Sequence, residues 1–162
     1  MPAAAPAGSP SPLPPATGAA PAQERLSVGR GRRVLVVDDS PTVRALMADM
    51  LGRLGYRPDD IAFAADTAGA RAAFDARAPR VVFLDLELDA ADSGAGLAME
   101  FLEKLPETRI ILMTGYPEED PQVRRVVRLG AFAYLGKPLR YQALKQVLHE
   151  LESEEMRQER IR

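Results

Sequence analysis

Short apolar runs alternate along the chain with longer stretches in which apolar residues recur every three or four positions. The short runs predict buried β-strands, and the spaced pattern predicts helices that each bury one face. The predicted strands are residues 34–38, 61–64, 81–85, 110–114 and 132–135. Because strands that alternate with helices usually form a parallel sheet, we expect a doubly wound α/β fold with five parallel strands. The expected strand order is 2-1-3-4-5, one of the two common orders of such folds.

Cap and turn residues mark the ends of the predicted helices. Ser40 and Pro41 predict the start of the first helix, because Ser caps free N–H groups and Pro suits the first turn. Gly55 predicts its end, and Thr67 is expected to cap the second helix. The second, third and fourth helices are expected to end at Pro79, Pro106 and Gly130, and the fifth is expected to begin just after Pro138.

Composition divides the chain into three parts. Of the first 22 residues, seven are Pro and eight are Ala, which cannot bury enough apolar surface to fold. Residues 1–32 are therefore predicted to be a disordered tail. Residues 33–151 carry the strands and helices, and residues 152–162 are predicted to be a charged helical extension. About eleven residues follow the last apolar stripe, so we expect a chain that works without an attached output domain.

Charge and residue content narrow the possible partners. The formal net charge is −2 and there is no Cys, which gives no indication of nucleic-acid binding and excludes thiolate chemistry. No apolar run reaches the roughly 20 residues that a membrane helix needs. We expect no membrane partner, no direct nucleic-acid binding and a cytoplasmic location.

Polar residues follow four of the predicted strands. Asp38 and Asp39 follow the first, Asp85 ends the third, Thr114 ends the fourth and Lys137 follows the fifth. Each has a plain explanation alone, as a cap, strand or turn residue. Together they should meet, because the carboxyl ends of parallel strands face one crevice. Three carboxylates repel one another unless a cation offsets their charge, and Mg²⁺ suits such oxygen ligands. The sequence therefore predicts a site for Mg²⁺ and a phosphoryl group.

Four segments around these residues resemble the signature blocks of receiver domains of bacterial two-component response regulators. They are Val-Val-Asp-Asp-Ser, Leu-Asp-Leu, Met-Thr-Gly and Gly-Lys-Pro-Leu. The resemblance implies a flavodoxin-like receiver fold that takes a phosphoryl group from a sensor histidine kinase or a histidine phosphotransfer protein. Its output would be altered binding of a downstream protein at the face formed by helix 4, strand 5 and helix 5.

The resemblance also implies a role for each site residue. Asp85 would be the phosphoacceptor, assisted by Thr114 and Lys137, and Tyr134 would act with Thr114 as the switch. The implied Mg²⁺ ligands are Asp38, Asp39, Asp85 and the backbone carbonyl of Glu87. The only His, His149, falls late in the last helix, so the phosphoryl donor is expected to be another molecule.

One loop departs from the family pattern. Asp89 stands where the family usually has Pro, and the glycine that usually follows comes late, at Gly94 or at Gly96. We expect the loop between Asp85 and Gly94 to be longer, more acidic and more mobile than in the family.

Two alternatives were open from the sequence. A receiver-like scaffold would act without phosphorylation. A Mg²⁺-dependent phosphatase of the haloacid-dehalogenase type would also use an aspartyl-phosphate, but it places the nucleophile in an Asp-x-Asp pattern after the first strand. The adjacent Asp38 and Asp39 lack that spacing.

Overall fold

The computed structural model describes residues 32–88 and 94–161. The expectations for the tail and for most of the Asp85–Gly94 loop lie outside these residues. The elements in chain order are β1 (Val34–Val37), α1 (Pro41–Arg53), a 3-10 turn η2 (Pro58–Asp60), β2 (Ile61–Ala64), α2 (Thr67–Arg77), β3 (Val81–Asp85), α3 (Gly94–Lys104), β4 (Arg109–Thr114), α4 (Pro121–Arg128), β5 (Ala133–Gly136) and α5 (Tyr141–Ile161). No helix in the described part of the chain is both long and apolar enough to cross a membrane.

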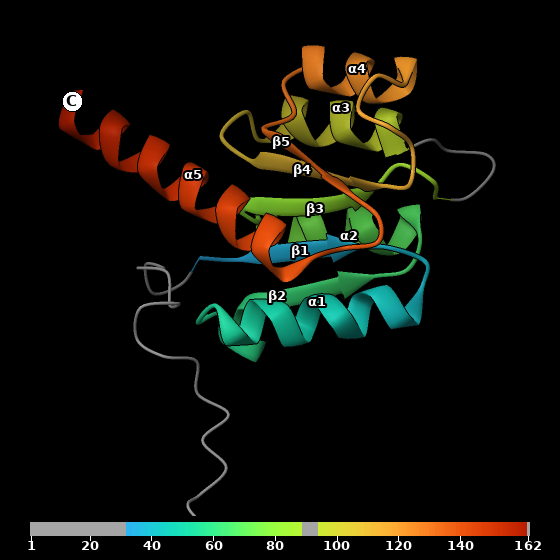
Figure 1. The fold of residues 1–162 in the computed structure, drawn as a ribbon, viewed down its shortest axis with the longest axis horizontal. Helices are drawn as coiled ribbons and strands as arrows, with labels where there is room; N and C mark the ends of the chain where they lie inside the picture. The colour runs from blue at the N-terminus through green and yellow to red at the C-terminus, as the bar shows by residue number, and fades with distance from the viewer. Residues whose placement is uncertain (1–31, 89–93, 162) are drawn as a thin grey trace, which may run out of the picture.

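The five strands form one parallel sheet in the order β2-β1-β3-β4-β5, which confirms the predicted fold and order (Figure 1). The register brings the carboxyl ends of the central strands level. Val37 lies opposite Leu84, so Asp38 and Asp85 follow side by side. On the other side of β3, Asp85 lies opposite Met113.

The two faces of the sheet bury separate apolar clusters. One cluster joins β-strand residues such as Val36 and Phe83 to Met47 of α1 and Leu148 of α5. The other joins the opposite face to α2, α3 and α4. Alternate side chains of a strand point to opposite faces, so the continuous apolar runs of β1, β3 and β4 fill both clusters. Figure 1 shows these helix layers on either side of the sheet.

The start of α2 differs from the sequence prediction. Asp66, not Thr67, is the cap: its side chain accepts a 2.6 Å hydrogen bond from the Gly69 N–H. Thr67 is the first residue of the helix and is buried. A carboxylate is a stronger acceptor for the free N–H groups of a helix start than a hydroxyl, and its charge suits the helix dipole.

The end of α5 is tied to the sheet rather than free along its whole length. The helix continues to Ile161, and its last turns extend past the sheet edge (Figure 1). Glu155 pairs with Arg32, which lies just before β1, and Glu154 pairs with Arg109 of β4 at 3.1 Å. These pairs hold the charged end of the helix to the sheet through Glu155. Met156 and Ile161 beyond them are exposed.

Candidate phosphoryl and metal site

The Asp38 backbone and carboxylate are held by four contacts. Its N–H donates to the Ala64 carbonyl at 3.0 Å and so continues the β1–β2 ladder by one residue. Its carboxylate Oδ1 accepts from the Ser40 N–H at 2.9 Å, and its carbonyl accepts from Nη1 of Arg44 at 2.7 Å. Oδ2 pairs with Lys137. Asp38 is fully buried, so these contacts compensate the loss of solvent around its polar atoms.

Asp85 ends β3 with its carboxylate almost fully enclosed. Its residue exposure is 2 %, and Oδ1 accepts a 3.0 Å hydrogen bond from the Glu87 N–H. Burial raises the pKa of Asp85 above its usual value, and the nearby charge of Asp38 adds to this. The Glu87 hydrogen bond and the Lys137 ammonium oppose the rise in this pKa without cancelling it. Without a further cation, burial and the charge of Asp38 therefore make ionisation of Asp85 harder than that of an exposed carboxyl.

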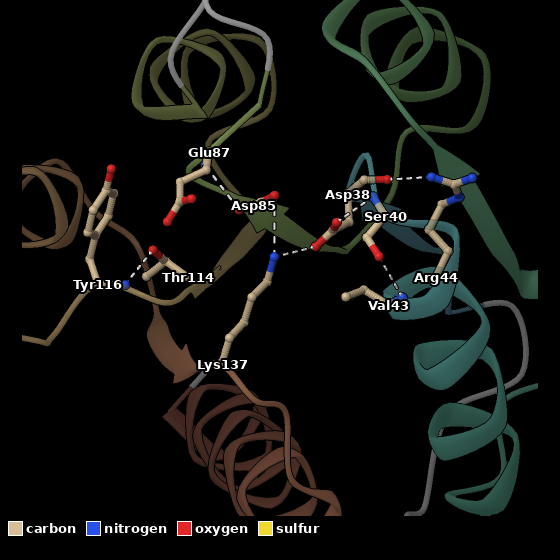
Figure 2. Close-up of polar contacts among 9 residues, drawn as sticks. All are labelled: Asp38, Ser40, Val43, Arg44, Asp85, Glu87, Thr114, Tyr116 and Lys137. Carbon is tan, nitrogen blue, oxygen red and sulfur yellow. Dashed lines mark hydrogen bonds and ion pairs between the residues drawn. The ribbon is translucent and has the colours of Figure 1, made fainter.

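Lys137 connects the two buried carboxylates. Its Nζ lies 2.8 Å from Oδ2 of Asp38 and 3.4 Å from Oδ2 of Asp85, and Figure 2 shows the side chain reaching from the β5–α5 connection to both. Burial acts to lower the pKa of Lys137, but the hydrogen bond to Asp38 and the charges of both carboxylates outweigh it, so this pKa is raised. The ammonium stays charged where a phosphoryl group would need a cation.

The three carboxylates predicted to bind Mg²⁺ converge. Oxygens of Asp38, Asp39 and Asp85 all lie within 4.8 Å of one another. Asp38 and Asp85 are buried, whereas Asp39 is exposed. One ammonium facing three carboxylates leaves excess negative charge, and an all-oxygen donor set suits a hard divalent cation. The residues present therefore fit Mg²⁺. The side chain of Glu87 is exposed, and a metal contact through its carbonyl stays a prediction.

Thr114 and Tyr134 are linked through Tyr116. The buried Thr114 hydroxyl at the end of β4 accepts a 3.1 Å hydrogen bond from the Tyr116 N–H. The Tyr134 hydroxyl donates to the Tyr116 carbonyl at 2.5 Å. Burial is the main cause that raises the pKa of Tyr134, with the charges of Glu118 and Glu119 adding to it. Tyr134 is half-buried, and its ring lies against Gly136, next to Lys137.

Gly94 lies against the backbone of the phosphoacceptor candidate. A Cβ at this position would come within 2.4 Å of the Asp85 carbonyl oxygen and 2.8 Å of the Leu86 Cα. The Gly94 N–H donates to the Leu86 carbonyl at 3.2 Å. Only glycine, which lacks a Cβ, permits this approach. Gly94 is also the first residue of α3. Of the two glycines that the sequence left open, Gly94 is therefore the one that seats α3 on the end of β3.

The comparison with protein families decides what kind of site this is. The model of the response regulator receiver domain matches residues 34–149. The chain belongs to this family. Receiver domains bind Mg²⁺ in an acidic pocket, and this chain carries a cluster of three carboxylates, Asp38, Asp39 and Asp85. The match gives no support to the haloacid-dehalogenase alternative.

Named relatives agree with the assignment. The receiver domain is 31 % identical over 106 residues to the nitrogen assimilation regulatory protein NtrX of Azorhizobium caulinodans, covering 65 % of this chain and 22 % of NtrX. It is 39 % identical over 114 residues to the transcriptional regulatory protein AruR of Pseudomonas aeruginosa, covering 66 % of this chain and 43 % of AruR. The chain thus spans less than half the length of these relatives.

Solved structures show the same fold. The receiver domain of NtrX from Brucella abortus has a TM-score of 0.65 and 31 % identity, covering 72 % of this chain and 95 % of that one. A CheY-like receiver domain from Methanospirillum hungatei has a TM-score of 0.70 and 23 % identity, covering 78 % of this chain and 98 % of that one. The second likeness concerns the fold alone.

Sequence reasoning missed two residues of the site. Arg44 reaches back from α1 to the Asp38 carbonyl, and Tyr116 joins Thr114 to Tyr134 through its backbone. Arg44 lies within the predicted first helix, where an arginine has no distinguishing pattern. Backbone contacts such as those of Tyr116 leave no mark in the residue type.

Proposed function

We propose that this receiver domain accepts a phosphoryl group on Asp85 in a Mg²⁺-dependent reaction. The donor is the phosphohistidine of a sensor histidine kinase or of a histidine phosphotransfer protein. The observation that carries the proposal is the position of Asp85, whose carboxylate is buried between the Lys137 ammonium and two further carboxylates. Receiver domains as a family interact with such histidine proteins.

The transfer itself needs little acid–base chemistry. A carboxylate oxygen of Asp85 forms a bond to phosphorus while the bond from phosphorus to the donor imidazole breaks, and the imidazole leaves with that electron pair. The Glu87 N–H holds Oδ1 and fixes the plane of the carboxylate. When bound, Mg²⁺ supplies positive charge against the carboxylates and the phosphoryl oxygens.

Lys137 has two tasks in this scheme. Before transfer it offsets the charges of Asp38 and Asp85. After transfer its ammonium can move from the Asp85 oxygen to an oxygen of the new phosphoryl group, with which it makes a charge-assisted contact. Its attachment to Asp38 keeps it at the site during this exchange.

The output is proposed to be a change in protein–protein affinity at the face of α4, β5 and α5. A phosphoryl oxygen would accept a hydrogen bond from the Thr114 hydroxyl and draw this side chain toward Asp85, and the Tyr116 N–H, which donates to the same hydroxyl, would follow it. A shift of the β4–α4 loop would then reach Tyr134 through its bond to the Tyr116 carbonyl. In this way phosphate shifts the populations of two existing states.

Three further expectations stay predictions. The matched relatives are longer than the stretch they share with this chain, so its working without an output domain is a proposal. The absence of direct nucleic-acid binding is another, since AruR is named a transcriptional regulatory protein. The cytoplasmic location is the third.

The test is exposure of the full chain to a small-molecule acyl phosphate, followed by intact mass. We expect the mass of one phosphoryl group to be added with Mg²⁺ and not with a chelator. No gain in mass under both conditions would favour a scaffold that acts without phosphorylation and would contradict the proposal.

A further inference from the structure

Arg44 donates hydrogen bonds to the residues on both sides of Asp39. Its backbone N–H donates to the Ser40 carbonyl at 3.1 Å, as the first turn of α1 requires. Its side chain turns back, and Nη1 donates to the Asp38 carbonyl at 2.7 Å. Asp39 thus lies between two residues whose carbonyls Arg44 holds. Figure 2 shows Arg44 and Lys137 approaching Asp38 from different sides.

The orientation of the Asp38 carbonyl sets the direction of the Asp39 side chain. A peptide unit is planar, so the Asp38 carbonyl and the Cα of Asp39 belong to one rigid group. If this plane rotates, the Asp39 side chain swings with it. Among the described residues, the structure records no hydrogen bond to the exposed Asp39 carboxylate. Its place within 4.8 Å of the two buried carboxylates therefore depends on its backbone.

Arg44 is well suited to hold that backbone. The guanidinium is planar, stays charged and presents several donors in a fixed fork. Arg44 is half-buried on the first turns of α1, and that helix is fixed to the sheet through Met47, Met50 and Leu51. The long side chain thus connects a packed helix to the end of β1.

We propose that Arg44 is a positioning residue for the metal site, which aims the Asp39 carboxylate at Asp38 and Asp85 by holding the Asp38 carbonyl. The inference rests on the proposed Mg²⁺-dependent function. Arg44 does not itself contact the cation or the phosphoryl group.

Removing the Arg44 guanidinium has two effects on Mg²⁺ affinity, and they act in opposite directions. Arg44→Met removes a positive charge next to an acidic pocket, and by Coulomb's law alone this strengthens the binding of a cation. Loss of the bond to the Asp38 carbonyl frees the peptide plane and weakens binding. The direction of the change in Mg²⁺ affinity therefore separates the two effects.

The experiment titrates the full chain with Mg²⁺ and follows backbone amide NMR shifts at low temperature, where the variants stay folded. Loss of an outer partner of a metal ligand typically weakens affinity about tenfold or more, so we expect Arg44→Met to raise the Mg²⁺ Kd by about tenfold. Arg44→Gln should do the same, because glutamine is too short to reach and suits a helix. Arg44→Lys should recover part of the affinity.

Arg53→Met is the matched control. Arg53 ends the same helix and stacks on the Tyr141 ring at 4.2 Å, so its loss removes an equal charge and a packing contact away from the carboxylates. The Mg²⁺ Kd of this control should stay within about twofold of the wild-type value, because salt screens the effect of an exposed charge that lies far from the site.

Two outcomes would overturn the inference in distinguishable ways. An equal or lower Kd in folded Arg44→Met or Arg44→Gln would show that Arg44 does not position Asp39, while the proposed function stands. A wild-type chain that binds no Mg²⁺ would overturn the proposed function and this inference with it.

Discussion

The hydroxyl of Tyr134 donates to the backbone carbonyl of Tyr116 across 2.5 Å. The N–H of the same Tyr116 donates to the Thr114 hydroxyl at 3.1 Å. A buried hydroxyl on the strand next to Asp85, the proposed phosphoacceptor, is thereby connected to a half-buried ring on β5 through one loop residue. The connection gives a physical route by which the state of Asp85 can reach the α4, β5 and α5 face.

Removing the Thr114 hydroxyl should separate phosphorylation from this response. Thr114→Ala keeps Asp85 and Lys137 in place, so we expect it to gain phosphate. It should lose much of the phosphate-dependent change in amide exchange across residues 115–128, since a hydrogen bond of about 0.5–1.5 kcal/mol is missing. The measurement is hydrogen exchange with and without an acyl phosphate donor. An equal exchange response in wild type and Thr114→Ala would refute the route.

Mg²⁺ should stabilise the fold through Asp39. At ten times Kd, binding to the native state alone adds about 1.4 kcal/mol to the free energy of unfolding. Asp39→Asn is expected to abolish the Mg²⁺-dependent rise in melting temperature, while Asp49→Asn on the exposed side of α1 keeps it. Asp39→Asn could also melt higher without metal, because carboxylate repulsion is relieved. A normal Mg²⁺ response in Asp39→Asn would exclude Asp39 as a ligand.

The raised pKa of Asp85 predicts how metal-free stability depends on pH. The native state keeps this proton to higher pH than the unfolded chain does. The contribution of Asp85 to the free energy of unfolding therefore falls as pH rises from the ordinary carboxyl pKa, about 3.9, through the raised native pKa. Each unit of difference corresponds to about 1.4 kcal/mol.

Asp85→Asn should remove this part of the pH dependence. We expect the variant to be more stable than wild type at pH 7 without Mg²⁺, and the difference to shrink toward pH 4. Urea unfolding across this range measures both, with Asp49→Asn as the control for an exposed carboxylate. A variant that is less stable than wild type at pH 7 would show that the pairing with Lys137 outweighs burial.

Gly94 should not tolerate a side chain. Gly94→Ala places a Cβ within 2.4 Å of the Asp85 carbonyl, so α3 or the end of β3 must move. We expect a loss of about 2–3 kcal/mol in the free energy of unfolding, the upper part of the range for overpacking. Gly52→Ala is the control: nothing lies within 4 Å of its Cβ, and within α1 it should gain about 0.5–1 kcal/mol. Equal stability of both variants in chemical unfolding would contradict this packing.

Much of the fold could be predicted because hydrophobic periodicity and sheet register are properties of the sequence pattern. The strands at 61–64 and 81–85 have the predicted bounds. The first strand ends one residue earlier than predicted, at Val37, and the fourth begins one residue earlier, at Arg109. Both ends of β5 lie one residue later than predicted, at Ala133 and Gly136. The meeting of Asp38 with Asp85 followed from strand ends that face one crevice.

Contacts set by geometry could not be predicted. Whether Asp66 or Thr67 caps α2 depends on one backbone torsion, and both residue types are good caps. The pairing of Glu155 with Arg32 depends on the path of α5 across the sheet. The charged stretch after Leu151 gave no apolar stripe from which to infer that path.

The most direct test of Asp85 as phosphoacceptor is chemical trapping of the phosphorylated chain. The full-length protein is treated with an acyl phosphate donor and Mg²⁺ and then reduced with borohydride, which converts an aspartyl-phosphate to homoserine with loss of phosphate. Peptide mass mapping locates the change. We expect homoserine at position 85 alone, and none in Asp85→Asn. Homoserine at position 38 or 39, or an unchanged Asp85 in a chain that has gained phosphate, would contradict the assignment.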